Sequence, residues 1–344
     1  MRRKKTLDIC RTTSLCKVAR CIFLTSSLFL GAMNLSLFTQ DKLTVAMLQS
    51  PTQTPVWVAL ESGFFKEYGL EVVPVQFNGG TQTIMALMSG DVQMTTTGGP
   101  AAVNAKLNGG SSVIIGTSVG VFPYTLYVSA AIRKPEDLKG KRVALVGFGG
   151  VTHSATRFAL QKLGLSPESD VTLVQMGLPF SNHLAAMSSG SIHGAIFQFP
   201  ETQKAVELGF NPILNLAESG IKFATNQVST TNDYVKTNRD RVKKFLMGFV
   251  AGTARVKSDR DFTIKVLRKY LRISDPRILA GTYDYWVHIY PTKPYVDPEE
   301  VRAYLVTLKD RGTAKPEDFI DNSIMAELDR EGFIDAAYSK FKKR

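Results

Sequence analysis

Apolar and polar residues alternate along the chain in a pattern of short strands and helices from Leu43 onward. The first strand, LTVAML, is followed by a turn with two prolines and by a helix whose apolar side chains recur at helical spacing. Between Phe64 and Thr97 come a strand rich in β-branched residues, a glycine turn, a helix and a further strand. This alternation predicts a mostly parallel α/β sheet covered by helices on both faces.

The glycine turn of this stretch is a candidate ligand-binding element. Gly79 and Gly80 permit a tight turn and a close backbone approach that a Cβ atom would obstruct. Thr81 is predicted to be the N-cap of the helix that follows. A helix N-terminus after a Gly-rich turn favours an anion or a polar head group. A plain strand-to-helix turn, which also favours glycine, is the alternative interpretation.

A second unit of the same kind follows Tyr124–Val128. Its first strand, RVALVG, leads into the loop Gly147–Thr152 and a helix from about His153 to Leu163. Two crossovers, near Val128 and near Val228, predict two lobes joined by a hinge, with a cleft between their strand ends. From Asn232 onward the pattern is largely helical.

The loop Gly147–Gly150 matches a dinucleotide-binding fingerprint poorly. Thr152 stands where the third glycine is expected, and the next strand ends in Gln175 where a ribose-binding acid is expected. We therefore interpret the loop as one side of the cleft, placed at a helix N-terminus. His153 opens that helix and could donate a hydrogen bond to an anion, although a solvated or capping histidine is the alternative.

Composition describes an ordinary globular chain with an export segment. The chain has 344 residues, of which 44% are hydrophobic, enough for a sizeable core. Seven of its 42 basic residues precede the apolar stretch Cys21–Phe38, which predicts a secretory signal over residues 1–40 and a periplasmic location. An uncleaved anchor is the alternative. All three cysteines lie in this segment, so we expect no disulfide, thiolate metal site or cysteine nucleophile beyond it.

Half of the net charge of +12 belongs to that same segment. The remaining charges are scattered, without a basic stripe interleaved with aromatic residues, so no nucleic-acid surface is predicted. The histidines are too dispersed for a metal site, and no cofactor is expected. A monomer is expected.

Three segments together resemble a known family. GFFKEYGLEVVPVQFNGGTQTIMALMSGDVQMTTTG resembles the solute-binding proteins of nitrate, sulfonate and taurine importers, also called the pyrimidine-precursor-synthase-like family. KPEDLKGKRVALVGFGGVTHSATRFALQKLGLSPESDV is similar to the opening of that family's second lobe, and AAMSSGSIHGAIFQFPE to a later element. His193 departs from the pattern, because the family usually has Asp there.

The resemblance implies a two-lobed type II periplasmic-binding fold with a hinge and a helical C-terminal region. It implies a first lobe of residues 41–127 and 229–344 and a second lobe of residues 128–228. It also implies an ABC permease with its ATPase as partners, and no enzymatic activity. The cleft positions that it carries over to this chain are Ser50, Thr52, Gln53, Thr54, Gly79, Gly80, Thr81, Thr97, Gly98, Phe148, Gly149, Gly150, Thr152, His153, Phe199 and Glu201.

The expected ligand is a small organic or inorganic anion, such as nitrate, taurine, another sulfonate or an aromatic acid. An enzyme on the same fold, of the pyrimidine-precursor or chorismate-dehydratase type, is the alternative. The former requires a cysteine-rich segment, which the chain lacks after residue 40. An effector lobe of a transcription regulator would need an N-terminal helix-turn-helix, where this chain has an apolar leader instead.

Overall fold

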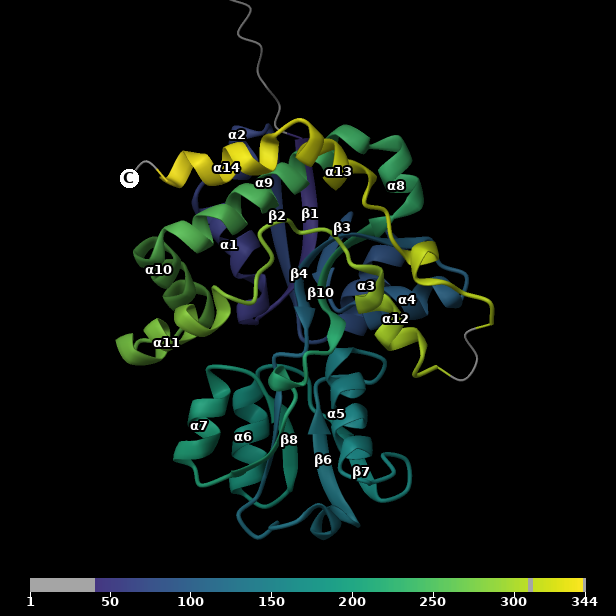
Figure 1. The fold of residues 1–344 in the computed structure, drawn as a ribbon, viewed down its shortest axis with the longest axis vertical. Coiled ribbons are helices and arrows are strands. Elements are labelled where there is room, and N and C mark those ends of the chain that lie inside the picture. Colours follow the sequence, from purple (N-terminus) through teal and green to yellow (C-terminus); the bar gives the residue numbers. More distant parts are fainter. Residues whose placement is uncertain (1–40, 309–311, 343–344) are drawn as a thin grey trace, which may run out of the picture. The chain divides into compact units, whose positions relative to one another are not determined.

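A computed structural model describes residues 41–308 and 312–342. These residues form two five-stranded sheets with helices packed against them (Figure 1). The predicted signal segment, residues 1–40, lies outside the described residues. Within the described ranges, no helix combines the length and apolar character that crossing a membrane requires.

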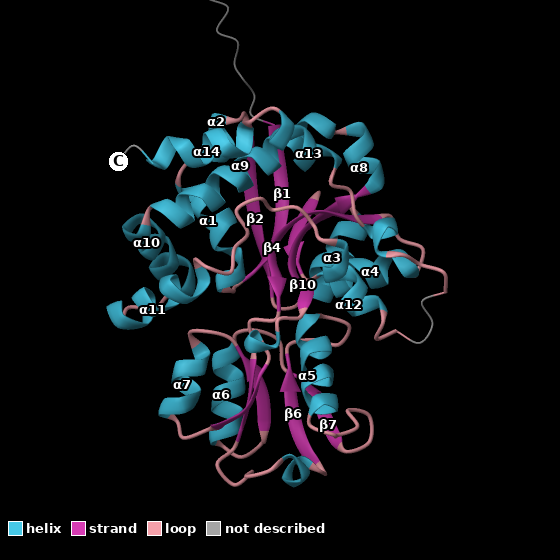
Figure 2. Cartoon of the chain, viewed as in Figure 1, coloured by secondary structure: helices cyan, strands magenta, loops and turns pink. Residues whose placement is uncertain are grey.

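The two sheets share one strand order, β2-β1-β3-β10-β4 in the first and β7-β6-β8-β5-β9 in the second. In each sheet the first three strands of that order are parallel, and the fourth runs antiparallel to its neighbours (Figure 2). The strand bounds are β1 Asp41–Leu48, β2 Leu70–Phe77, β3 Met94–Thr97, β4 Ser112–Val121, β5 Thr125–Val128, β6 Lys141–Leu145, β7 Val171–Gln175, β8 Gly194–Phe197, β9 Asn211–Asn215 and β10 Lys222–Thr231.

Helices alternate with the strands in both halves and then dominate the C-terminal third. The helices of the alternating part are α1 Thr54–Glu61, α2 Phe64–Glu67, α3 Gly80–Ser89, α4 Gly99–Leu107, α5 Val151–Lys162, α6 Phe180–Ser188 and α7 Glu201–Glu207. Those of the C-terminal third are α8 Asn232–Thr237, α9 Arg239–Ser258, α10 Arg260–Leu271, α11 Pro276–Trp286, α12 Pro298–Leu305, α13 Ser323–Arg330 and α14 Phe333–Lys342. Short 3-10 helices are η1 Pro51–Gln53, η2 Pro135–Leu138, η3 Ala217–Ser219 and η4 Pro316–Phe319.

The chain passes between the two sheets twice. It leaves the first sheet after Val121 and enters the second at Thr125, and it returns between Asn215 and Lys222. The C-terminal helices α8–α14 all pack on the first lobe (Figure 1). This is the two-lobed fold predicted from the sequence, with mixed rather than mostly parallel sheets.

The sequence of β1 is a nearly continuous apolar run from Leu43 to Leu48 because both faces of this strand are buried. Leu43, Val45 and Met47 pack into the cluster formed with α1 and α9, while Ala46 faces the opposite cluster with α3 and α4. Successive side chains of a strand point to opposite faces, so a sheet buried on both faces needs apolar residues at every position.

One prediction about the local structure was wrong. Thr81 is not the N-cap of α3, because the helix begins at Gly80 and Gly79 is its N-cap. Gly79 has an extended backbone, with φ −166° and ψ 148°, and provides no side-chain cap. This leaves the first amide groups of the helix without an internal partner.

Candidate functional site

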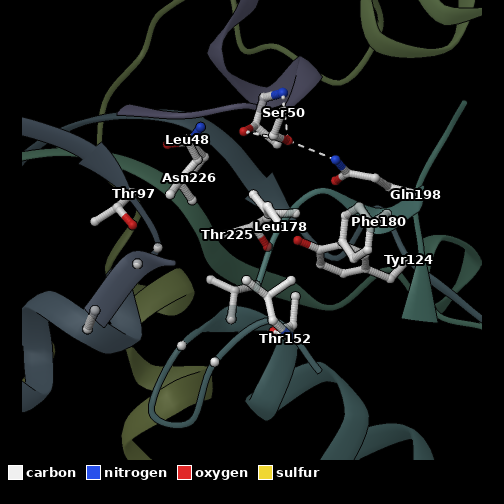
Figure 3. A pocket seen from close by; sticks show the side chains of 18 residues that line it. Leu48, Ser50, Thr97, Tyr124, Thr152, Leu178, Phe180, Gln198, Thr225 and Asn226 are labelled. Carbon is white, nitrogen blue, oxygen red and sulfur yellow. Dashed lines mark hydrogen bonds between the residues drawn. The ribbon is translucent and has the colours of Figure 1, made fainter. Parts of the chain in front are cut away.

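A small cavity lies between the two lobes, at the loops that follow the strands. Its volume is about 50 Å³. This space accommodates a ligand of several non-hydrogen atoms but not a large one. Its lining comes from both lobes (Figure 3) and consists of Leu48, Ser50, Thr52, Gly80, Thr97, Gly98, Ala101, Tyr124, Val146, Gly147, Gly150, Val151, Thr152, Leu178, Phe180, Gln198, Thr225 and Asn226.

Three helix N-termini meet at this cavity. Helices α3, α4 and α5 have Gly79, Gly98 and Gly150 as N-caps, and none of the three has a side-chain cap or an acidic residue in its first turn. The helix dipoles and the free first-turn amide groups therefore remain available to a ligand, except at Pro100 of α4, which has no N–H. An anion or a strongly polar acceptor group suits such a position.

Four buried polar side chains of the lining also lack partners among the described residues. Thr97 Oγ1, Thr225 Oγ1, Gln198 Oε1 and both polar atoms of the Asn226 amide make no hydrogen bond. Their side chains are all nine-tenths or more buried. An unpaired buried polar atom costs about 1–3 kcal/mol. A bound ligand or ordered water would recover that free energy.

The polar groups of the cavity are all uncharged. No Asp, Glu, Lys, Arg or His side chain is among the lining residues that the structure describes. Likewise, within residues 41–308 and 312–342 no group of three or more potential metal-ligating side chains is placed to hold a metal ion. The site is thus built from backbone amides, hydroxyls, carboxamides and an apolar wall.

Seven of the sixteen predicted site residues line the cavity: Ser50, Thr52, Gly80, Thr97, Gly98, Gly150 and Thr152. The Ser50 hydroxyl joins the two lobes, because its Oγ accepts a hydrogen bond from Gln198 Nε2 at 2.8 Å (Figure 3). Thr152 Oγ1 accepts from the Val146 amide at 3.0 Å and so fixes the start of α5 against the end of β6.

The other nine do not line the cavity. Thr81 Oγ1 instead donates to the Phe148 carbonyl at 2.9 Å, and Asn104 Nδ2 donates to the Gly149 carbonyl at 3.4 Å. Both bonds connect the first lobe with the loop of the second. The Phe148 side chain is 48% exposed, so it faces solvent rather than the cavity. Thr81, Phe148 and Gly149 therefore hold the lobes together at the edge of the site.

His153 and the turn residues Gln53 and Thr54 bind other protein groups. His153 Nδ1 accepts from the Gly149 amide at 3.3 Å, and burial lowers the pKa of His153. A neutral imidazole held in this way does not supply positive charge to an anion. Gln53 Nε2 donates to the Thr96 carbonyl at 3.0 Å, and Thr54 Oγ1 donates to the Pro51 carbonyl at 2.6 Å. Gly79 is the N-cap of α3 and precedes Gly80, which lines the cavity.

Phe199 fits into a socket on helix α11. Its ring stacks on Tyr285 with centroids 5.7 Å apart, and its carbonyl accepts from Trp286 Nε1 at 2.9 Å. A Cβ at Gly281 would lie 2.9 Å from the Phe199 ring, so the socket requires glycine. Two residues later, the Glu201 carboxyl is buried and its Oε2 lacks a partner. Burial raises the pKa of Glu201 to about 7.

Gly147 and Val151 belong to the loop that was predicted as one side of the cleft. Sequence reasoning missed the other lining residues, which come from strands, helices and loops of both lobes: Leu48, Ala101, Tyr124, Val146, Leu178, Phe180, Gln198, Thr225 and Asn226. One signal was available: Thr225 and Asn226 are polar residues in the middle of β10, and they are buried like most residues of this strand. Buried polar side chains in a central strand need a partner, and here the cavity is what they face.

Three comparisons place the chain among known proteins. A family model described as NMT1/THI5 like matches residues 50–260. The chain is 34% identical over 173 residues to the taurine-binding periplasmic protein of Escherichia coli. That match covers 50% of this chain and 53% of the relative, so it spans about half of the relative's length.

Two solved structures share the fold. The alkanesulfonate-binding protein SsuA of Xanthomonas axonopodis, bound to MOPS, has a TM-score of 0.66 and 19% identity, and the match covers 78% of this chain and 91% of that one. The nitrate-binding protein NrtA of Synechocystis has a TM-score of 0.70 and 13% identity, with 85% and 89% covered. At these identities the likeness concerns the fold alone.

Proposed function

The chain belongs to the NMT1/THI5-like family, and we propose that it is the extracytoplasmic solute-binding component of an ABC importer for a small anion. In this role it captures the solute in the interlobe cavity and delivers it to the permease. The observation that carries the proposal is the meeting of three uncapped helix N-termini with unpartnered hydroxyl and amide groups in one small cavity.

The ligands in the names of the relatives support an anionic ligand for this protein. One is a taurine-binding protein, one binds alkanesulfonates and one binds nitrate. Taurine and alkanesulfonates carry a sulfonate, so all three names point to a compact oxyanion. Backbone amides at helix N-termini hold such a group without a cationic side chain. The cavity offers that kind of recognition from both lobes at once.

The proposed mechanism is conformational. A ligand between the lobes contacts Thr97 and Asn226 on one side and Gly150 and Thr152 on the other. It therefore binds the closed arrangement more tightly than an open one, and this difference in affinity drives closure. The hydrogen bonds from Thr81 to Phe148 and from Gln198 to Ser50 then add to the closed state. The permease recognises the closed state, because closure brings the outer surfaces of the two lobes together into one binding surface.

The enzymatic alternative finds little support in the cavity. General acid–base catalysis needs a titratable group within hydrogen-bond reach of the reacting atom. The described lining offers only Tyr124, whose pKa is raised mainly by burial. A neutral tyrosine alone does not form the acid–base pair that a dehydratase or a pyrimidine-forming enzyme would use.

Thermal shift and isothermal titration with nitrate, sulfate, ethanesulfonate and taurine test the proposal. A true ligand raises the melting temperature with concentration. In the variant Thr97→Val the hydroxyl at the cavity is lost, and we expect about 10-fold weaker binding, since one hydrogen bond to a charged group contributes about 1.5–3 kcal/mol. If no anion shifts the melting temperature or gives binding heat, the proposal is wrong.

Thr95→Val is the matched control for this variant. Thr95 lies two residues earlier on β3, is fully buried and also has an unpartnered Oγ1, but it does not line the cavity. We expect it to leave anion affinity unchanged. Equal loss of binding in both variants would mean that Thr97 acts only through the stability of the strand.

A further inference from the structure

The cavity has two chemically different ends. At one end Gly80, Gly98 and Thr97 lie together with the start of α5: a Cβ at Gly80 would lie 2.7 Å from Thr97 Oγ1, and one at Gly98 would lie 2.0 Å from Val151 Cγ2. All three helix N-termini therefore gather here. In Figure 3 Thr97 lies on the left, and the side chains of Phe180 and Tyr124 lie on the right. We call the first the amide end and the second the aromatic end.

The aromatic end is apolar but carries two neutral polar groups. Leu178 and Phe180 form its wall, and Tyr124 and Gln198 bring a hydroxyl and a carboxamide. The Gln198 side chain is 1% exposed. One of its amide atoms is held by Ser50, and the other has no partner. Burial raises the pKa of the Tyr124 hydroxyl, which stays uncharged at neutral pH.

These groups discriminate between three substituents that a ligand could place there. A methyl group would leave the free Gln198 atom unpaired, which costs about 1–3 kcal/mol. An ammonium group would enter an apolar pocket with no carboxylate on the described lining, and a buried charge without a counter-charge costs more. A hydroxyl group pairs with Gln198 in either orientation of the amide, because it both donates and accepts.

We propose that the preferred ligand is a short organic monoanion that carries a hydroxyl group at the end opposite its anionic head. The anionic head lies at the amide end, and the hydroxyl pairs with Gln198 at the aromatic end. A zwitterion with an ammonium group, such as taurine, is disfavoured, although a taurine-binding protein is among the relatives. This inference rests on the proposed function as an anion-binding protein.

Glu201 is the carboxylate that could reverse this preference. It does not line the cavity, but its buried Oε2 has no partner, and Glu201 contributes to the raised pKa of Tyr124. If the Glu201 carboxylate reached the ligand, it would pair with an ammonium group. The experiment therefore needs a variant that removes this charge.

Isothermal titration at neutral pH with ethanesulfonate, 2-hydroxyethanesulfonate and 2-aminoethanesulfonate tests the inference. The three share the sulfonate head group and a two-carbon chain. Ethanesulfonate ends in a methyl group, and the other two carry a hydroxyl or an ammonium group on that same carbon. We expect the hydroxyl compound to bind the wild-type protein at least about 10-fold more tightly than each of the others. In Gln198→Leu this advantage should fall below about threefold, and because the hydrogen bond to Ser50 is lost as well, the affinities for all three compounds should fall together.

Gln198→Glu provides the opposite change. It places a carboxylate at the aromatic end, so the ammonium compound should become the tightest ligand of the three. Thr156→Val is the control, since Thr156 is fully buried with an unpartnered Oγ1 but lies outside the cavity. Circular dichroism and ethanesulfonate binding show whether each variant is folded.

The possible outcomes separate this inference from the proposed function. If 2-aminoethanesulfonate binds the wild type most tightly, the inference is wrong, and loss of that preference in Glu201→Gln would identify Glu201 as the counter-ion. If ethanesulfonate binds as tightly as the hydroxyl compound, or if only nitrate binds, the inference is also overturned while anion binding stands. If no anion binds at all, it is the proposed function that fails.

Discussion

The glycine turns of the two lobes look alike in sequence but use glycine for different physical reasons. In the first lobe Gly98 has an ordinary φ of −69°. A Cβ there would lie 2.0 Å from Val151 Cγ2 of the other lobe, so any larger residue would force the Val151 side chain or the lobe to move. In the second lobe Gly149 has a φ of +72°. The atom nearest to a Cβ at this position would be Asn104 Nδ2, at 3.5 Å. One glycine provides space and the other provides a backbone conformation.

If the lobes close on a ligand as proposed, the turn at Gly98 is the one whose packing depends on closure. Gly98 contacts Val151 only when the two lobes are together, so its small size matters in the closed state. The positive φ of Gly149 favours glycine whether or not the lobes are together, although the Gly149 carbonyl also accepts from Asn104 of the first lobe. Substitutions at the two positions should therefore affect ligand binding and folding stability separately.

The largest effect is expected for Gly98→Ala. The new methyl would overlap Val151 Cγ2, and separating the lobes to relieve the overlap would remove the contacts of one lobe to the ligand. We expect ligand affinity to fall by about 1,000-fold, or about 4 kcal/mol, with a nearly unchanged unfolding transition. Isothermal titration and urea unfolding measure the two quantities.

Two further variants make this prediction specific. Val151→Ala removes the overlapping methyl, so the double variant Gly98→Ala/Val151→Ala should regain much of the affinity in a double-mutant cycle. Gly79→Ala is the matched control, because a Cβ at Gly79 would have nothing within 4 Å. Strict additivity in the cycle would show that the two residues do not meet in the ligand-bound protein.

The second prediction compares one buried carboxyl on each lobe. Glu300 of α12 packs on the first sheet, where its Oε2 accepts from Thr117 Oγ1 at 3.1 Å and Gln227 Nε2 at 2.9 Å. Glu201 of α7, on the second lobe, has a free Oε2. Burial is the main cause that raises the pKa of each carboxyl to about 7.

A carboxyl whose pKa is higher in the folded state stabilises the fold fully below its unfolded pKa. That stability is lost as the pH rises through the folded pKa. The free energy of unfolding should thus fall by about 2 kcal/mol per carboxyl between about pH 5 and about pH 8. Glu300→Gln and Glu201→Gln should each flatten part of this dependence in urea titrations. If a variant keeps the wild-type pH dependence, the carboxyl that it lacks is already ionised at pH 5 in the folded wild-type protein.

The third prediction concerns Gly149. In Gly149→Ala an L-residue must adopt a left-handed φ, which costs about 1–2 kcal/mol. We expect the free energy of unfolding to fall by this amount. The ligand affinity of the folded variant should differ little from that of the folded wild-type protein. Gly149→Asn should lose less, since asparagine tolerates this conformation. A loss of affinity as large as that of Gly98→Ala would contradict the proposed division between the two turns.

The smallest effect is expected for Thr81→Val, which removes the hydroxyl that bonds to the Phe148 carbonyl across the lobes. The residue is exposed, so water replaces part of the lost hydrogen bond. Ligand affinity should fall about threefold, or about 0.7 kcal/mol, in isothermal titration. Thr81→Ser keeps the hydroxyl and should bind like the wild type. Equal affinities in all three proteins would show that this bond adds nothing to closure.

The sequence predicted the fold more completely than the site. The strand–helix alternation indicated two α/β lobes because strands buried on both faces need apolar residues on both faces, as β1 has at Leu43, Val45, Ala46 and Met47. Helix ends were less well predicted. In the C-terminal part predicted to be largely helical, α11 ends at Trp286, and the nearby Tyr290 donates its hydroxyl to the Pro51 carbonyl at 2.7 Å. A residue 239 positions away in sequence decides that contact.

The sequence by itself determined the two lobes, the glycine turns at the helix starts and the lack of cysteine beyond the leader. These features follow from local backbone preferences and from periodic burial, which a linear pattern records. Only the tertiary structure decided which loop residues face the cavity. Thr97 and Gly98 do, whereas Thr81 and Phe148 bond to each other, and Phe199 fills a socket on α11. The direction of each side chain there depends on the opposite lobe, and no local pattern encodes that contact.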